Sequence, residues 1–130
     1  MAFYVNPTYL DLALDGIANV ADRVFVCSEF PTTYAEASAT YMLASITTTV
    51  AVGGGDYTKG DSEVAGGRRL TLLYQTGTVT NAGVATHIAI CKSTATSAVL
   101  LVVTCLQTPL EAAESIALDD LTYTIGGPTA

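Results

Sequence analysis

The most apolar part of the chain, the segment from Ala98 to Gln107, constrains the fold more than any other feature of the sequence. Successive side chains of a strand point to opposite faces of a sheet. Here both sets of alternate positions are apolar: Val99, Leu101 and Val103 on one face, and Leu100, Val102 and Leu106 on the other. This pattern predicts a strand that is buried on both faces and therefore lies centrally in its sheet, with Pro109 breaking the pattern beyond it.

The first predicted element is a helix near the N-terminus. Asn6 can cap it, and Pro7 suits the first helical position because its missing N–H is not needed there. Apolar residues recur at helical spacing in one stripe, which consists of Leu10, Ala13, Leu14, Ile17 and Ala21. Thr33 and Glu36 form a capping box, which predicts a second, short helix through about Leu43.

The other predicted elements are strands, bounded by Gly, Pro, Asn and Asp. They cover residues 23–30, 46–52, 70–74, 78–80, 84–91, 115–118 and 121–125. Asn81-Ala82-Gly83 predicts a tight hairpin turn, and the polar stretch 56–67 predicts a loop. The order predicts an α+β fold: a mostly antiparallel β-sheet or sandwich with one N-terminal helix and a second short helix. We expect a single domain over residues 1–130, with 1–6 as an extended arm and 126–130 as a flexible tail.

Charge restricts the classes of partner. The net charge is −7, and the one adjacent basic pair is Arg68–Arg69, which we interpret as a strand start or as a partner of Asp61 or Glu63. Nucleic-acid binding needs clustered Lys and Arg, so no nucleic-acid partner is expected. No secretory signal or apolar run of about 20 residues is present, and no membrane partner is expected. Only 13% of the residues are charged, which favours a surface partly covered by other subunits.

No catalytic, cofactor or metal site is predicted, and no small-molecule substrate is expected. His87 is the sole histidine, and we interpret it as a hydrogen-bonded sheet residue or an interface residue. The three cysteines, Cys27, Cys91 and Cys105, are expected to be reduced and buried, with a disulfide among them as the alternative. The enzymatic alternative is a hydrolase that uses Cys27 or Cys105 with His87.

Three acidic or glycine-rich segments are also interpreted structurally. Gly53–Gly55 lacks the lysine and hydroxyl ending of a phosphate loop and predicts a plain loop. Asp56, Asp61 and Glu63 lie in one stretch but lack the ligand order of a calcium loop. Asp119-Asp120 predicts a bend between strands rather than a pair of catalytic acids.

Tyrosine is the best sequence indicator of a contact surface, because its ring buries a large area and keeps a polar tip. The chain has seven tyrosines and no tryptophan. The candidate interface residues are Tyr4, Tyr9, Tyr34 and Tyr57. Tyr57 is the first choice, since its surroundings are otherwise glycine and acidic residues.

Three segments carry a resemblance to a known group of proteins. They are Val26-Cys27-Ser28-Glu29-Phe30-Pro31-Thr32-Thr33-Tyr34-Ala35-Glu36-Ala37, Gly67-Arg68-Arg69-Leu70-Thr71 and Ala85-Thr86-His87-Ile88-Ala89. Together they resemble small structural proteins of tailed bacteriophages, in which a helix precedes a strand ending in Cys-Ser and then Pro-x-Thr-Tyr-x-Glu-Ala. The glycine-rich loop at Gly53–Gly55 is longer than in that group.

The resemblance implies a non-enzymatic virion component that is made in the bacterial cytoplasm and assembled in many copies. It implies a capsid decoration, or cement, protein whose partners are the major capsid protein and copies of itself. The acidic charge suits the outside of a capsid better than its DNA-facing interior. A tail or neck component and a glycan- or receptor-binding module on the virion surface are the alternatives.

Overall fold

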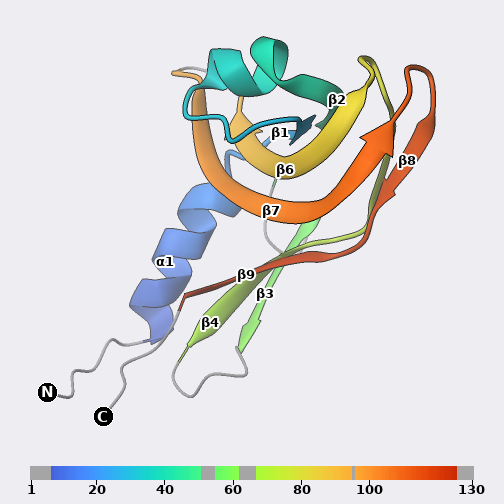
Figure 1. Cartoon of the computed structure of the whole chain (residues 1–130). Coiled ribbons are helices and arrows are strands. Elements are labelled where there is room, and N and C mark those ends of the chain that lie inside the picture. Colours follow the sequence, from blue (N-terminus) through green and yellow to red (C-terminus); the bar gives the residue numbers. More distant parts are fainter. Residues whose placement is uncertain (1–6, 51–54, 62–66, 95, 126–130) are drawn as a thin grey trace, which may run out of the picture. The chain divides into compact units, whose positions relative to one another are not determined.

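The computed structural model describes residues 7–50, 55–61, 67–94 and 96–125. These residues form mostly antiparallel β-structure with one N-terminal α-helix, which confirms the predicted α+β class (Figure 1). The predicted arm 1–6 and tail 126–130 lie outside the described residues. The chain forms two compact units: unit 1 comprises residues 1–19, 49–74 and 119–130, and unit 2 comprises residues 20–48 and 75–118. The expectation of one domain stays a prediction.

Unit 1 packs a helix against a small sheet. Helix α1 (Pro7–Ala18) contacts β3 (Tyr57–Asp61) and β4 (Arg68–Leu72), and β9 (Leu121–Ile125) completes the order β3-β4-β9. The helix begins at the predicted proline but ends at Ala18. Among its residues from Leu12 onward, Leu14 and Ala18 are buried, whereas Ala13 of the predicted stripe is exposed. An ion pair between Asp15 and Lys59, with 2.8 Å between Oδ1 and Nζ, joins α1 to β3.

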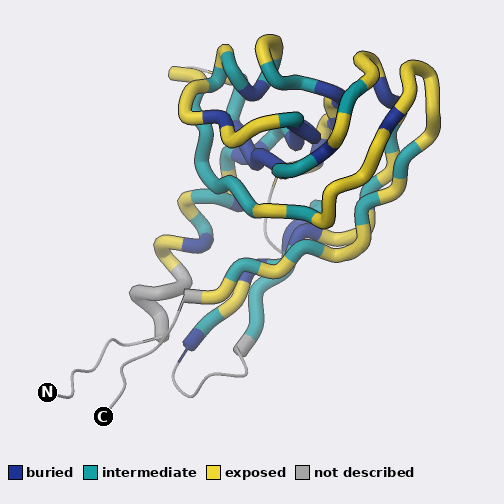
Figure 2. The backbone as a smooth tube through the Cα atoms, viewed as in Figure 1, coloured by how far each residue is buried: buried dark blue, intermediate teal, exposed yellow. Residues whose placement is uncertain are grey.

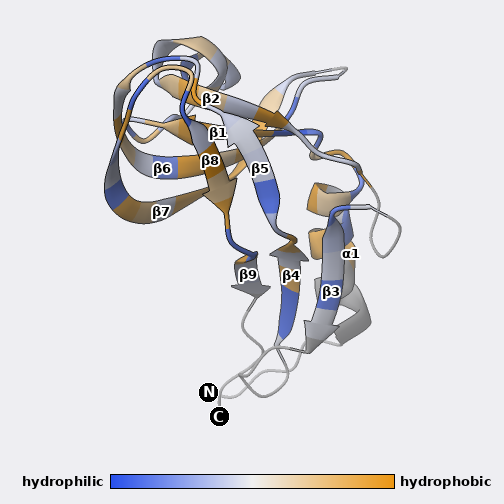
Figure 3. Ribbon diagram, turned by 90° about the vertical axis from the view of Figure 1, so that its right-hand side faces the viewer, coloured by the Kyte–Doolittle hydropathy of each residue, from blue (hydrophilic) through white to orange (hydrophobic). Residues whose placement is uncertain are grey.

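The predicted loop 56–67 is wrong in its first half, because Tyr57–Asp61 forms strand β3. Each residue of β3 has a register partner on β4, from Tyr57 opposite Leu72 to Asp61 opposite Arg68. Glycine and acidic residues have low β-propensity, so the local sequence does not indicate this strand. The neighbouring strand β4 supplies its hydrogen-bond ladder. Arg68 opens β4 as predicted, and Figure 3 shows the hydrophilic start of that strand.

Unit 2 contains a four-stranded antiparallel sheet and a two-stranded ribbon. The sheet order is β2 (Met42–Thr47), β1 (Arg23–Cys27), β6 (Gly83–Lys92) and β7 (Ala98–Leu110), of which β6 and β7 are long and curved (Figure 1). The ribbon pairs β5 (Gln75–Thr78) with β8 (Ser115–Leu118). Asp119 and Asp120 lie between β8 and β9, as predicted for a bend.

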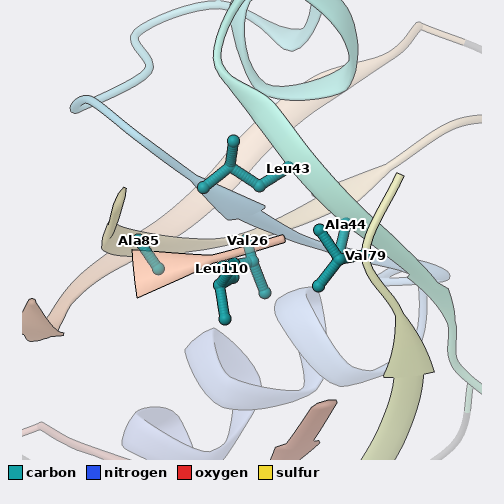
Figure 4. Close-up of a cluster of buried hydrophobic side chains, with 6 residues drawn as sticks. All are labelled: Val26, Leu43, Ala44, Val79, Ala85 and Leu110. Carbon is teal, nitrogen blue, oxygen red and sulfur yellow. The ribbon is translucent and has the colours of Figure 1, made fainter. Parts of the chain in front are cut away.

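Two apolar clusters form the core of unit 2. One consists of Phe25, Cys27, Ala37, Ala89 and Cys91, with Tyr34, Tyr41, Met42, Val99 and Val102 packed against it. The other, drawn in Figure 4, consists of Val26, Leu43, Ala44, Val79, Ala85 and Leu110. Ile116 and Leu118 pack against this second cluster, and Figure 3 shows the apolar colour of their strand, β8. Phe25 and Val26 are adjacent in β1, so these two side chains lie on opposite faces of the sheet.

The predicted hairpin between residues 78–80 and 84–91 is wrong, because β5 pairs with β8 and not with β6. The turn residues are tied to β2 instead: the N–H groups of Thr80 and Asn81 donate to the Leu43 carbonyl at 2.7 and 3.1 Å. Asn81 Nδ2 also donates to the Met42 carbonyl at 3.0 Å. These bonds hold the turn against β2, whereas the strand that follows the turn, β6, pairs with β1 and β7. The segments before and after the turn therefore do not pair with each other.

The second predicted helix is shorter than expected. It is a single π-helical turn, η1 (Glu36–Thr40), and Leu43 lies in β2 rather than in the helix. Half of the predicted capping box forms, since the Glu36 N–H donates to Thr33 Oγ1 at 3.2 Å. The Glu36 carboxylate accepts bonds from the backbone N–H and the hydroxyl of Thr32, at 2.9 and 2.7 Å. The extended pairing of β2 with β1 ends the helix early.

Asp22 joins two loops at one end of the four-stranded sheet. Its carboxylate accepts bonds from Ser93, at 2.7 Å from the backbone N–H and at 2.6 Å from Oγ. Its backbone carbonyl accepts the N–H of Thr48 at 3.0 Å. Burial alone would raise the pKa of Asp22, but the Ser93 bonds and the nearby Arg23 outweigh burial and lower that pKa below its usual value of 3.8.

We expect Asp22→Asn to reduce the free energy of unfolding by about 1 kcal/mol at neutral pH, because a hydrogen-bonded carboxylate is lost. A lowered folded-state pKa gives stability that is present above the usual pKa and is lost as the pH falls through the folded value. The wild type should therefore lose stability between about pH 5 and pH 2 that Asp22→Asn does not lose. Urea unfolding across this range measures the difference, and parallel pH profiles would contradict it. Ser93→Ala, which keeps the carboxylate, should retain the pH dependence in weaker form.

Candidate subunit interface

The structure separates the four candidate tyrosines. Tyr4 lies outside the described residues, and Tyr9 lies in α1 with its side chain outside them. Tyr34 is half-buried and packs edge-to-face on Phe25, with 5.8 Å between ring centroids. Tyr57, the first choice, is 0% exposed. Its prediction as an intersubunit contact is therefore wrong, because a side chain without surface has none to offer a partner. A loop at residues 56–67 would leave Tyr57 at the surface, whereas strand β3 buries it.

The predicted central strand is an edge strand, which corrects the most constraining expectation from the sequence. Among the described residues, β7 has β6 on one side and no strand on the other. Every residue from Ala98 to Pro109 is at least partly exposed, and only Leu110 is buried (Figure 2). The central strands are β1 and β6, whose buried residues include Val24, Ile88 and Ile90. The apolar side chains of β7 are thus covered by the chain only in part.

The register of β7 against β6 is interrupted twice. Ile90 pairs with Leu101 and Cys91 with Val99, so Leu100 is an extra residue. Ala85 pairs with Thr108 and His87 with Thr104, so the three residues from Cys105 to Gln107 lie opposite Thr86 alone. Such bulges bend a strand and re-aim its side chains. Leu106 lies in the larger bulge and is 88% exposed.

The outer edge of β7 lacks the usual protection over part of its length. Natural edge strands are commonly guarded by charged side chains, prolines or bulges against pairing with another chain. No charged residue occurs from Ala98 to Leu110. Pro109 and the Cys105–Gln107 bulge protect the C-terminal end, and Leu101–Thr104 keeps a regular register with His87–Ile90. We call Leu101–Thr104 the open segment of β7.

Phe30 adds an exposed ring over β6, the strand that pairs with the open segment. It is 56% exposed and packs edge-to-face on His87, with 5.4 Å between ring centroids. His87 is the register partner of Thr104 in the open segment. The His87 Nδ1 lies 2.8 Å from Thr86 Oγ1, as expected of a hydrogen-bonded sheet histidine. Phe30, His87 and the open segment together form the candidate contact surface.

The same sheet brings together the thiol and the imidazole of the enzymatic alternative. Cys27 and His87 are directly opposite each other in the register of β1 and β6. Burial raises the pKa of the Cys27 thiol to about 11, and its Sγ is directed at the Ala37 and Phe25 carbonyls at 3.7 and 3.9 Å. A thiol in this state is protonated at neutral pH and is a poor nucleophile. This arrangement favours a packing role for Cys27.

The other cysteines are also free thiols. Cys91 is buried in the same cluster as Cys27, and burial raises its pKa to about 12. Cys105 is half-buried in the β7 bulge, and burial raises its pKa as well. The expected burial is confirmed for Cys27 and Cys91, whereas Cys105 is only half-buried.

The acidic candidates do not form a cation site in the described part of the chain. Asp56 Oδ2 accepts the N–H of Thr49 at 2.7 Å, Asp61 is the register partner of Arg68, and Glu63 lies outside the described residues. Within residues 7–50, 55–61, 67–94 and 96–125, no group of three or more His, Cys, Asp or Glu side chains is arranged to hold a metal ion.

No helix among the described residues is both long and apolar enough to cross a membrane. No family model, curated protein or solved structure matches the chain. The function therefore has to be inferred from the residues and the geometry of this chain.

Proposed function

We propose that this protein is a structural subunit of a tailed-bacteriophage particle, and within that class a capsid decoration protein. It would stabilise the shell by binding the major capsid protein and further copies of itself. The observation that carries the adhesive role is β7, an edge strand of 13 residues without a charged side chain, of which only Leu110 is buried. Apolar surface removed from water stabilises an assembly by about 25 cal/mol per Å².

The resemblance to tailed-phage structural proteins supports the proposal that this chain is a subunit of a phage particle. Its longest segment, Val26–Ala37, runs from the end of β1 into η1 and includes Phe30, which packs on His87, the register partner of Thr104. Its third segment, Ala85–Ala89, lies in β6, which pairs with β7 in the same sheet. Two of the three resembling segments thus meet at the candidate contact surface.

The net charge of the chain supports a location on the outer face of the capsid shell. The net charge of −7 would oppose approach to packaged DNA and favours the solvent side of a capsid. The low content of charged residues leaves uncharged surface for contacts with subunits. A decoration protein on the outside of the head agrees with both properties.

The mechanism is physical and needs no catalytic step. A protein that binds the assembled shell but not its separated subunits stabilises the shell by mass action. Many copies on one particle make modest contacts effective, because the contacts act together. The protonated, buried state of Cys27 is compatible with such a role.

Immunogold electron microscopy tests the location. Particles of the phage that encodes this chain are labelled with antibody against the purified protein, and gold is expected over the heads. Gold confined to the tail would overturn the decoration role and support a tail or neck component. Particles without gold, with the protein also absent from them by mass spectrometry, would overturn the virion role.

The stabilising role is tested on particles made without the protein. Such particles should release DNA at a lower temperature than the wild type, and adding back the purified chain should restore the release temperature. Adding back the Leu12→Lys variant should restore the release temperature as the wild type does, because Leu12 is an exposed leucine on α1, outside β7. An unchanged release temperature in the depleted particles would contradict the role.

A further inference from the structure

We propose that two copies of this chain associate through their β7 strands, which pair antiparallel about a two-fold axis that places Val103 opposite Val103 of the second copy. The two four-stranded sheets would then join edge to edge. This inference builds on the proposed adhesive role and names the surface and the partner for one of its contacts. Four observations support it: the free edge, its open segment, its charge and the state of the opposite edge.

The edge offers backbone hydrogen bonds. Alternate residues of an edge strand direct N–H and C=O groups away from the sheet, where water or another strand must satisfy them. No described residue supplies a strand on that side of β7. The bulges at Leu100 and Cys105–Gln107 limit regular pairing to Leu101–Thr104. A two-fold axis beside Val103 pairs Val102–Thr104 of one copy with the same residues of the other.

The side chains are self-complementary in that register. Val103 would lie opposite Val103 of the second copy, and Val102 opposite Thr104 of the second copy. Continuing the register brings Leu100 toward Leu106 of the second copy, which would cover the most exposed leucine of β7. An antiparallel two-fold pairing places the same strand opposite itself, so any charge in it would face like charge. A chain of net charge −7 has no charged residue from Ala98 to Leu110, and the pairing meets no repulsion there.

The opposite edge of the sheet explains why the occupant is β7 of another copy. Edge strand β2 forms a bridge between Ala44 and Val79, and the Leu43 carbonyl accepts bonds from Thr80 and Asn81. Pairing of β7 with β2 of another copy would have to displace these contacts and would also propagate into an open filament. Pairing of β7 with β7 keeps them and closes after two copies.

The experiment is sedimentation analysis of the full chain from about 1 μM to about 500 μM, a range that brackets a weak dimer. The wild type should show a reversible monomer–dimer equilibrium. A double variant, Thr104→Lys with Leu106→Lys, should weaken dimerisation at least about tenfold, because it brings cations together at the contact. Both side chains are exposed, so the fold should persist, and circular dichroism checks this. Leu12→Lys should dimerise like the wild type.

Hydrogen exchange provides a second readout that needs no variant. Amide protection in residues 101–104 should rise with protein concentration, while protection in α1 should not. A wild type that stays monomeric throughout, or a dimer that the double variant does not weaken, would overturn the pairing. A monomer that still decorates particles overturns the pairing alone, whereas a β7 dimer absent from every particle overturns the proposed function alone.

Discussion

Tyr57→Ala is expected to lower the free energy of unfolding by about 3–5 kcal/mol, the usual cost of truncating a large buried aromatic side chain. Tyr57 is the largest of the fully buried side chains and is 0% exposed. Its register partner, Leu72, is also buried, so neighbouring side chains have little freedom to refill the space. Urea unfolding followed by circular dichroism measures the change.

Tyr74→Ala is the matched control, because Tyr74 belongs to the same unit and is 56% exposed. It should change the free energy of unfolding by less than about 0.5 kcal/mol. The pair also separates the two roles considered for Tyr57. A contact residue would lose particle binding on truncation without losing stability. If Tyr57→Ala has the same free energy of unfolding as the wild type but no longer binds particles, the assignment of Tyr57 to the core is wrong.

The fold class could be predicted because local signals agree with the structure over most elements. Pro7 starts α1, and the predicted strands at β1, β4, β6 and β9 form within a few residues of their predicted ends. In β3 and in the turn at Asn81, the outcome depends on partners that are distant in sequence. β3 is held by β4, and Asn81 is held by β2. Propensity and turn chemistry carry no information on which partner is chosen.

The position of β7 shows a different kind of error. Apolar residues on both faces normally indicate a strand covered on both sides, and here the chain covers them only in part. One signal in the sequence pointed to the edge. Pro109 lies inside β7, opposite Val84, and proline within a sheet is found essentially on edge strands or at bulges. The strand continues through Pro109 to Leu110, so this proline does not end it as predicted.

The candidate contact surface could not be predicted from residue type alone. Tyrosine composition indicated an interface, but Tyr57 is in the core, and Tyr34 packs on Phe25. The exposed residues Phe30, which packs on β6, and Leu106, in β7, resemble core residues in the sequence. Their exposure follows from the sheet order and from the bulge, which depend on pairings between distant segments. The surface is therefore a property of the topology.

Gly55→Ala is expected to cost about 2–3 kcal/mol, the upper part of the range for overpacking. A Cβ atom at Gly55 would lie 2.5 Å from the backbone oxygen of Thr49 and 3.1 Å from that of Val50. Backbone atoms cannot move aside as a flexible side chain can. The same Thr49 carbonyl accepts the N–H of Asp56 at 3.1 Å, and the Asp56 carbonyl accepts the N–H of Leu73 at 2.8 Å. Relief of the clash would therefore disturb the bonds that hold the start of β3 beside the end of β4.

Gly16→Ala provides the matched control with the opposite sign. Gly16 lies inside α1, and a Cβ atom there would meet nothing within 4 Å. Alanine should raise the free energy of unfolding by about 0.5–1 kcal/mol, because glycine loses more backbone freedom in a helix. Both variants add one methyl group to unit 1, so their difference in urea midpoint isolates the space around each glycine. Equal midpoints would contradict the close approach at Gly55, and a Gly55→Ala variant more stable than the wild type would exclude it.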